Sequence, residues 1–180
     1  MKLMIASDIH GSAYYCDQLL KAYQEEKADK LLLLGDILYH GPRNDLPEGY
    51  NPKKVIAMLN DMAEEILCVR GNCDTEVDQM VLKFPILAEY CILYLENHMI
   101  FATHGHKLNE DTPPLLKRGD ILLNGHTHIP KCTEYEDFIY INPGSVSIPK
   151  EDSPHSYLLL ENNRFQWKEL NGNCYKEYKI

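Results

Sequence analysis

The sequence predicts an α/β protein in which two mixed sheets pack face to face and helices lie outside them. Residues 2–69 alternate short apolar runs with amphipathic segments in the order β-α-β-α-β, whereas residues after 85 form mostly short apolar runs separated by turns. At 180 residues, with 44% apolar and 25% charged side chains, the chain has the size and composition of a globular domain. We therefore expect one domain over residues 1–180.

The first half of the chain contains apolar runs that end in polar turns. Between these runs, apolar side chains recur at helical spacing. Ser12 or Gly11 is placed to cap the first helix, and Pro52 suits the start of the second. The stretch 40–52 is dense in turn-forming residues and predicts a long loop. The predicted elements are a strand at 2–7, a helix at 13–27, a strand at 30–34, a helix at 53–62 and a strand at 65–69.

The second half predicts strands joined by turns. Turn signals at Glu96-Asn97-His98 and Glu136-Asp137 indicate hairpins, and Asn142-Pro143-Gly144-Ser145 indicates a tight turn. A helical turn is expected at 113–118. The predicted strands are residues 88–95, 99–103, 120–123, 131–135, 138–141, 156–160 and 164–170.

Charge and cysteine usage limit the classes of function. The net charge of −9 argues against duplex nucleic acid as a partner, because an acidic surface is repelled by the phosphate backbone. A small anionic substrate would then need a local positive centre, which a metal supplies. None of the six cysteines forms a C-x-x-C pair, and no run predicts a signal peptide or a membrane span. We expect a reduced, cytoplasmic protein without a membrane partner.

Two histidines, His126 and His128, follow the predicted strand at 120–123. Side chains at i and i+2 of an extended chain share a face, so this pair is suited to one metal ion or two neighbouring ions. Taken singly, each such residue is equally compatible with a cap, a turn or a satisfied core group. The residues that share this position after a strand are Asp8, His10, Asp36, Asn72, His104, His126 and His128. Because strand ends meet at one sheet edge, their joint occurrence predicts a metal site.

The composition of this set favours two ions. Seven ligands are too many for one tetrahedral zinc ion and suit two ions that share a bridging carboxylate. Nitrogen and oxygen ligands favour manganese, iron, zinc or magnesium, and the histidines argue against magnesium alone. Paired divalent ions are a known device for hydrolysis at phosphorus, because they activate a shared water and stabilise negative charge. A small phosphoester is therefore the expected substrate.

Five ordered motifs also carry a resemblance to a known family. They are Asp8-x-His10, Gly35-Asp36, Gly71-Asn72-Cys73-Asp74, Thr103-His104-Gly105-His106 and Gly125-His126-Thr127-His128. Over nearly the whole chain, the sequence resembles the calcineurin-like metallophosphoesterases, and among them the small bacterial and archaeal YfcE-type phosphodiesterases. This resemblance implies a four-layer α/β-β/α sandwich of two mixed sheets with flanking helices, and a manganese-dependent phosphodiesterase.

The resemblance further implies a role for each ligand position. The first ion would take Asp8, His10 and His128, the second would take Asn72, His104 and His126, and Asp36 would bridge the two. A hydroxide between the ions would attack phosphorus. The implied cofactors are two divalent ions, Mn²⁺ first, with Zn²⁺, Fe²⁺ and Ni²⁺ as other candidates.

The sequence departs from the family pattern at Cys73. There the family has a histidine that donates a proton to the leaving oxygen, whereas a thiol has a reference pKa of about 8.5 and is a weaker donor. Cys73 is thus a candidate catalytic residue, or else a small side chain that fills space under the site. Asp74 is a second catalytic candidate, with capping of the following turn as its alternative role.

The loop at 40–52 carries candidates for substrate binding. Arg43 is able to clamp a phosphate oxygen, or is a surface arginine. His40 and Asn44 lie beside it, and Asn72 is expected to contact substrate as well as metal. His106 and Thr127 are candidates for orienting the ligands.

Two other functions compete with the phosphodiesterase. A phosphomonoesterase acting on small phosphates would use the same metal core. A non-catalytic protein-binding scaffold, like the retromer scaffold subunit that this fold resembles, would show a degraded metal site. All seven ligand positions are filled here, which favours the enzyme. A homo-oligomer is left open.

Overall fold

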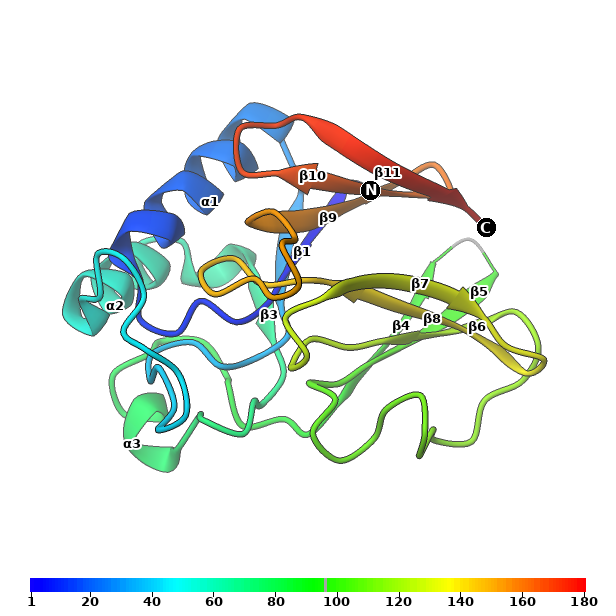
Figure 1. Cartoon of the computed structure of the whole chain (residues 1–180), viewed down its shortest axis with the longest axis horizontal. Helices are drawn as coiled ribbons and strands as arrows, with labels where there is room; N and C mark the ends of the chain where they lie inside the picture. The colour runs from blue at the N-terminus through cyan, green and yellow to red at the C-terminus, as the bar shows by residue number, and fades with distance from the viewer. Residues whose placement is uncertain (96) are drawn as a thin grey trace.

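The computed structural model of the chain describes residues 1–95 and 97–180. Two mixed β-sheets face each other, and helices lie outside the larger one (Figure 1). The predicted α/β class with two mixed sheets is therefore confirmed. No helix in the described residues is long and apolar enough to cross a membrane.

The larger sheet has six strands in the order β11-β10-β9-β1-β2-β3. Strands β1, β2 and β3 are parallel, while β9, β10 and β11 add to β1 as antiparallel neighbours. The strands are β1 (Leu3–Ala6), β2 (Lys30–Leu33), β3 (Ile66–Cys68), β9 (Ser156–Glu161), β10 (Arg164–Glu169) and β11 (Cys174–Lys179). The C-terminal hairpins thus complete the sheet that the N-terminal half begins.

The smaller sheet has five strands in the order β4-β5-β6-β8-β7. Its three central strands are parallel, and antiparallel strands form both edges. The strands are β4 (Cys91–Leu95), β5 (His98–Ala102), β6 (Asp120–Leu123), β7 (Pro130–Glu134) and β8 (Phe138–Pro143). Parallel strands in both sheets therefore end in loops that are free to carry a site.

Helices α1 (Ala13–Glu26) and α2 (Pro52–Asn60) cover the outer face of the larger sheet (Figure 1). Ser12 begins α1, where its hydroxyl oxygen accepts a hydrogen bond from the Tyr15 N–H at 3.2 Å. Pro52 begins α2 after an Asn51 cap, as its missing N–H allows. The two helices shield from water one face of a sheet whose parallel strands are apolar on both faces.

Strand β1 shows how the two cores arise. Its side chains alternate, so that Met4 and Ala6 pack toward the helices whereas Leu3 and Ile5 pack toward the smaller sheet. Trp167 of β10 lies in this inter-sheet core, fully buried, and its Nε1–H donates to the Asn142 carbonyl of β8 at 2.8 Å. The inter-sheet core thereby fixes how the strand ends of the two sheets meet.

The outer face of the smaller sheet is covered by a loop. Leu108 and Leu116, from the segment 105–119, pack on a cluster formed by Phe101, Leu122, Phe138 and Tyr140. The helical turn predicted at 113–118 was wrong, because that segment is irregular. Pro113 and Pro114 lack N–H donors and disfavour helical backbone in the residue before each.

Other differences follow from short or exposed elements. A one-turn helix, α3 (Glu76–Gln79), and a 3₁₀ turn, η1 (Ala63–Glu65), were not predicted because each is too short for a periodic pattern. Strand β11 was missed because nearly all its side chains are exposed. Asn142 and Pro143 extend β8, so the turn there begins at Gly144. The turn predicted at 96–98 includes residue 96, outside the described residues.

Replacing Trp167 by Phe should lower the free energy of unfolding by about 2–4 kcal/mol, because the change removes a buried hydrogen bond and leaves a cavity between the sheets. Urea denaturation at unchanged m-value measures this loss. Tyr94→Phe, at an aromatic position that is 76% exposed in β4, is the matched control and should change stability by less than about 0.5 kcal/mol. Equal effects of the two changes would show that Trp167 does not hold the sheets together.

Candidate metal centre

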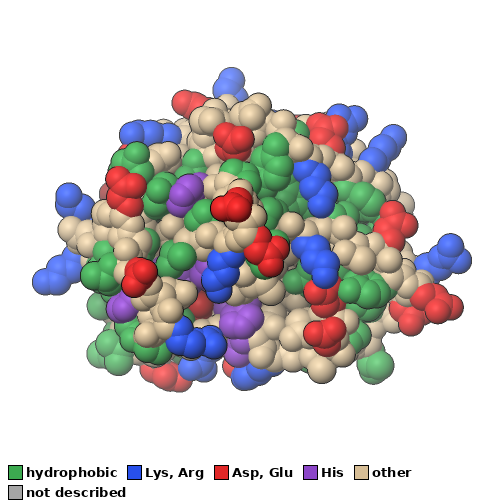
Figure 2. Space-filling view, in the orientation of Figure 1, with side chains coloured by type: hydrophobic (Ala, Val, Ile, Leu, Met, Phe, Trp, Pro, Cys, Tyr) green, Lys and Arg blue, Asp and Glu red, His purple; other side chains and the backbone are tan. Residues whose placement is uncertain are grey.

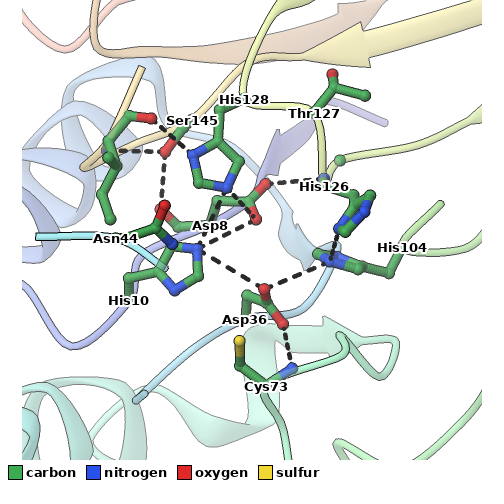
Figure 3. A network of polar contacts seen from close by, with 12 residues as sticks. Asp8, His10, Asp36, Asn44, Cys73, His104, His126, Thr127, His128 and Ser145 are labelled. Atoms are coloured by element: carbon green, nitrogen blue, oxygen red, sulfur yellow. Dashed lines mark hydrogen bonds and ion pairs between the residues drawn. The ribbon is translucent and has the colours of Figure 1, made fainter. Parts of the chain in front are cut away.

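The loops after five parallel strands meet at one edge of the two sheets (Figure 3). They border a cavity of about 420 Å³. The loops after β1, β2 and β3 of the larger sheet bring Asp8, His10, Asp36 and Asn72, and those after β5 and β6 of the smaller sheet bring His104, His126 and His128. Most of this set is buried, with His126 half-buried and Asn72 exposed. The structure therefore brings together the seven predicted ligand candidates.

Five of these seven residues adopt left-handed backbone. The φ angles are 60° at Asp8, 47° at His10, 56° at Asp36, 66° at His126 and 64° at His128. Such angles are uncommon for residues other than glycine and persist where the surroundings fix them. Each of these loops therefore leaves its strand along a strained path that presents a carboxylate or an imidazole to the cavity.

Asp8, His10 and His128 form the first of two clusters. The Nε2 atoms of His10 and His128 lie 3.3 Å apart, and they are 3.5 Å and 3.2 Å from Asp8 Oδ1. Each Nδ1 is 2.7 Å from a backbone carbonyl oxygen, that of Tyr39 for His10 and that of Ile148 for His128. Because a carbonyl only accepts, each Nδ1 carries a proton, and Nε2 is the ring atom that faces the cluster and would coordinate a cation.

The second cluster is formed by Asn72, His104 and His126. His104 Nδ1 donates to the Leu34 carbonyl at 2.7 Å, and His104 Nε2 lies 3.1 Å from Asn72 Oδ1 and 3.2 Å from His126 Nδ1. Asp36 Oδ2 is 3.5 Å from His104 Nε2 and 3.7 Å from His10 Nε2. Asp36 therefore lies between the two clusters.

Divalent cations fit these residues. The Nε2 lone pairs of His10 and His128 face each other, and buried Asp8 Oδ1 accepts no hydrogen bond in the described part of the chain. Groups that only accept repel one another unless a cation lies between them. Separations of 3.2–3.5 Å within the first cluster also suit ligand atoms that surround one cation at about 2.1 Å. Carbonyl oxygens that fix the Nδ1 protons are a usual support for such imidazole ligands.

The side chains carry charge consistent with a cation site. Burial opposes ionisation of Asp8, but the adjacent imidazoles of His10 and His128 hold its pKa well below the usual value. Burial likewise opposes protonation of His104, yet the hydrogen bond to Asp36 and the charges of Asp8 and Asp36 raise its pKa to about 9. Burial and the nearby charge of His104 lower the pKa of His126 to about 4. Both carboxylates are thus ionised, and His126 is neutral and able to coordinate.

Two glycines allow the strand ends to approach each other. A Cβ on Gly125 would collide with the Ser7 hydroxyl, and one on Gly71 would collide with the Asp36 carboxylate. The close approach at Gly125 lets the His126 N–H donate to Asp8 Oδ2 at 3.1 Å. The glycine before each ligand motif is therefore a packing requirement of the site.

Asp74 lies beneath the site and is almost completely buried. Its carboxylate accepts hydrogen bonds from the backbone N–H groups of Asp36 and Gly71 at 2.8 Å and of Ile37 at 2.9 Å. It therefore joins the loop after β2 to the loop after β3. The alternative that Asp74 caps the following turn was wrong, because Thr75 caps α3.

Cys73 and the 40–52 loop border the cavity. Cys73, Arg43 and Asn44 line its wall, whereas His40 packs edge-on against Tyr39 and Tyr50 outside the lining. Burial and the charge of Asp36 raise the pKa of the Cys73 thiol, so it stays protonated at ordinary pH. Asp74 is likewise outside the cavity wall.

Three further residues complete the surroundings. Thr127 lines the cavity and its hydroxyl oxygen accepts from Asn142 Nδ2 at 3.2 Å, while the His106 ring lies 5.4 Å from that of His104. Lys150 lines the same wall and was missed, because no predicted strand precedes it. The turn at Asn142–Ser145 returns the chain to the site, so the residues that follow this turn could have been considered as part of the cavity wall.

Fold and site together are those of a metal-dependent phosphoesterase. The sequence profile of the calcineurin-like phosphoesterase superfamily domain matches residues 1–164. The phosphodiesterase YfcE of Escherichia coli strain K12 is 49% identical over 163 residues, which are 91% of this chain and 89% of that protein. This chain belongs to the calcineurin-like phosphoesterase superfamily, so the predicted family is confirmed. The extent of one domain over residues 1–180 stays a prediction.

Solved structures agree with this assignment. That of Yfce, a phosphoesterase from E. coli, superposes with a TM-score of 0.97 at 45% identity and covers 100% of both chains. Wild-type Vps29 from Entamoeba histolytica, complexed with Zn²⁺, gives a TM-score of 0.63 at 22% identity and 99% coverage of each chain. At that identity the second likeness shows the fold alone. The expected class of enzyme, a metallophosphoesterase, is confirmed at the level of the family.

Asp74→Asn should lower the free energy of unfolding by about 2–4 kcal/mol, because one amide oxygen cannot replace a carboxylate that accepts three buried N–H groups. Bound metal after dialysis should also fall, since the loops that carry Asp36 and Asn72 lose their link. Urea denaturation and elemental analysis measure the two effects. Asp45→Asn, an exposed carboxylate outside the site, is the control. A variant with full stability and full metal content but no turnover would instead make Asp74 catalytic.

Proposed function

We propose that this protein is a manganese-dependent phosphodiesterase with a dinuclear centre. The observation that carries the proposal is the position of Asp36, whose Oδ2 lies 3.5 Å from a nitrogen of one cluster and 3.7 Å from a nitrogen of the other. The relative at 49% identity is named a phosphodiesterase, which supports a diester substrate. Ligands without thiolate but rich in imidazole and carboxylate support manganese, with zinc, iron and nickel as competitors.

Each side chain then has a defined task. Asp8, His10 and His128 would hold one cation, Asn72, His104 and His126 would hold the other, and Asp36 would contact both. When bound, the cations supply a nucleophile from water near neutral pH and stabilise charge on the phosphoryl oxygens. The protein contributes by holding the Nδ1 protons on backbone carbonyls, so that each Nε2 would be the coordinating atom, and by fixing the strained loops that carry the carboxylates.

Substrate contacts come from the wall of the cavity. Arg43 offers a guanidinium to an anionic oxygen of the substrate, and Asn72 lies at the mouth beside His104. His40 supports this loop, because its carbonyl accepts from Asn44 Nδ2 at 2.8 Å. The protonated Cys73 thiol lies on this wall, at the position where the family pattern has a histidine that donates a proton to the leaving oxygen.

Metal analysis tests the dinuclear centre. After dialysis against Mn²⁺, the wild-type protein should retain two ions per chain, and Asp36→Asn should retain at most one and lose most diesterase turnover, because a neutral amide bridges cations poorly. Asp120→Asn, which alters a buried carboxylate outside the site, should keep both ions. One ion or none in the wild type, or turnover in Asp36→Asn near that of the wild type, would contradict the bridging role.

Leaving-group dependence tests Cys73. A strong general acid contributes about 10²–10⁴-fold and matters most for a basic leaving oxygen, whereas a neutral thiol donates weakly. We expect log kcat/KM to fall steeply with leaving-group pKa in the wild type, to fall less steeply in Cys73→His, and to change little in Cys73→Ser for aryl esters. Phosphomonoesters in the same series test the monoesterase alternative. Parallel slopes at equal metal content would mean that another group protonates the leaving oxygen.

A further inference from the structure

Lys150 lies at the rim of the metal cavity, and its backbone is fixed there. Its N–H donates to the carbonyl of His128 at 3.2 Å, and two residues earlier the Ile148 carbonyl accepts from His128 Nδ1 at 2.7 Å. The Lys150 carbonyl in turn accepts from the Ser153 N–H at 3.1 Å, which closes a turn. The loop that orients a candidate metal ligand therefore also places a lysine beside it.

Arg43 reaches the same cavity from the loop between β2 and α2. Neither Arg43 nor Lys150 forms an ion pair with a carboxylate in residues 1–95 or 97–180, although Glu151 and Asp152 directly follow Lys150. Figure 2 shows histidine side chains in a hollow on this face with basic side chains near them. The exposed charged side chains that line this cavity, Arg43 and Lys150, are thus both cationic in a chain of net charge −9.

The wall of the cavity offers charge and hydrogen bonds, and in the described residues its flat rings are those of the ligand candidates His10, His126 and His128. Besides the ligand candidates, its polar side chains are Arg43, Asn44, Thr127 and Lys150. Among the described residues, no Phe, Tyr or Trp lines it. A nucleobase, which is usually held against an aromatic face, therefore has no such partner here.

A simple phosphodiester does not account for both rim cations. Its scissile phosphate carries one negative charge, which would lie at the metal ligands, whereas Arg43 and Lys150 are two cations at the rim that pair with no carboxylate in residues 1–95 or 97–180. We propose that the preferred substrate is a phosphodiester with a second anionic group, which Lys150 and Arg43 bind. This inference rests on the proposed phosphodiesterase function and specifies its substrate class.

Matched substrates test the second anionic group. The metal-loaded protein is assayed with p-nitrophenyl phosphodiesters whose other ester group is ethyl, 2-carboxyethyl or 2-phosphoethyl, so that the leaving group stays constant. The anionic esters should give a kcat/KM about tenfold above that of the ethyl ester, since two partly screened charge contacts each contribute about threefold to fivefold. The two anionic arms tell whether carboxylate or phosphate is preferred.

Variants assign the effect to the two cations. Lys150→Gln and Arg43→Gln should each reduce the anionic-to-ethyl ratio by about threefold, and the double variant should bring it near one. Lys179→Gln, an exposed lysine on β11 away from the cavity, should leave the ratio at its wild-type value. Metal content of each variant is measured so that a change at the cluster is recognised.

The outcomes separate this proposal from the function on which it rests. A wild-type ratio near one, with good turnover of the ethyl ester, would overturn the second anionic group and leave the phosphodiesterase intact. A high ratio that neither variant changes would overturn the assignment to Lys150 and Arg43. No turnover of any diester by protein that holds two ions would overturn the phosphodiesterase and this proposal with it.

Discussion

The structure depends on two carboxylates, Asp8 and Asp36, that are buried at the ends of adjacent parallel strands. A buried charge is costly unless groups of opposite charge or hydrogen-bond donors surround it. Here imidazole nitrogens from both sheets surround the carboxylates at 3.2–3.7 Å, and cations held between these groups would compensate the buried charge. Neutralisation of these carboxylates therefore requires that the strand ends of the two sheets meet, and the apolar inter-sheet core provides that meeting.

The convergence of these strand ends requires strained backbone in the loops that follow them, and neighbouring residues must stabilise that backbone. Left-handed residues of this kind cost on the order of 1–3 kcal/mol each. The Asp8 carbonyl is held by the hydroxyls of Ser145 and Ser147, both at 3.0 Å, and the Gly125 carbonyl is held by Asn142 Nδ2 at 2.7 Å. Beneath Asp36, the Asp74 carboxylate performs the same task. The polar residues around the site thus act mainly on the backbone, and they leave the cavity to the ligands.

The strand-end pattern made most of the site predictable from the sequence. Apolar runs locate parallel strands, and their carboxyl ends converge whatever the loops do, so Asp8, Asp36, His104 and the His126/His128 pair were found without coordinates. Lys150 was not predicted because its position depends on the path of the irregular segment between β8 and β9. Strand β11 was not predicted because an exposed edge strand lacks the alternation of apolar and polar side chains. The task of Asp74 could not be read either, since it depends on N–H groups from Asp36 and Ile37, far away in the chain.

Substrate choice in this fold must come from the parts that the sequence predicts least well. The ligand set is constrained by the metal, and the Vps29 likeness shows that the sheets persist at 22% identity. The parts of the cavity wall that carry no ligand candidate include the 40–52 loop, with Arg43, and the segment after β8, with Lys150. Neither loop has to neutralise the buried carboxylates, so both are able to change charge without loss of the centre. If the proposed function holds, the strand ends set the chemistry, and the two loops at the rim are where discrimination between esters is expected.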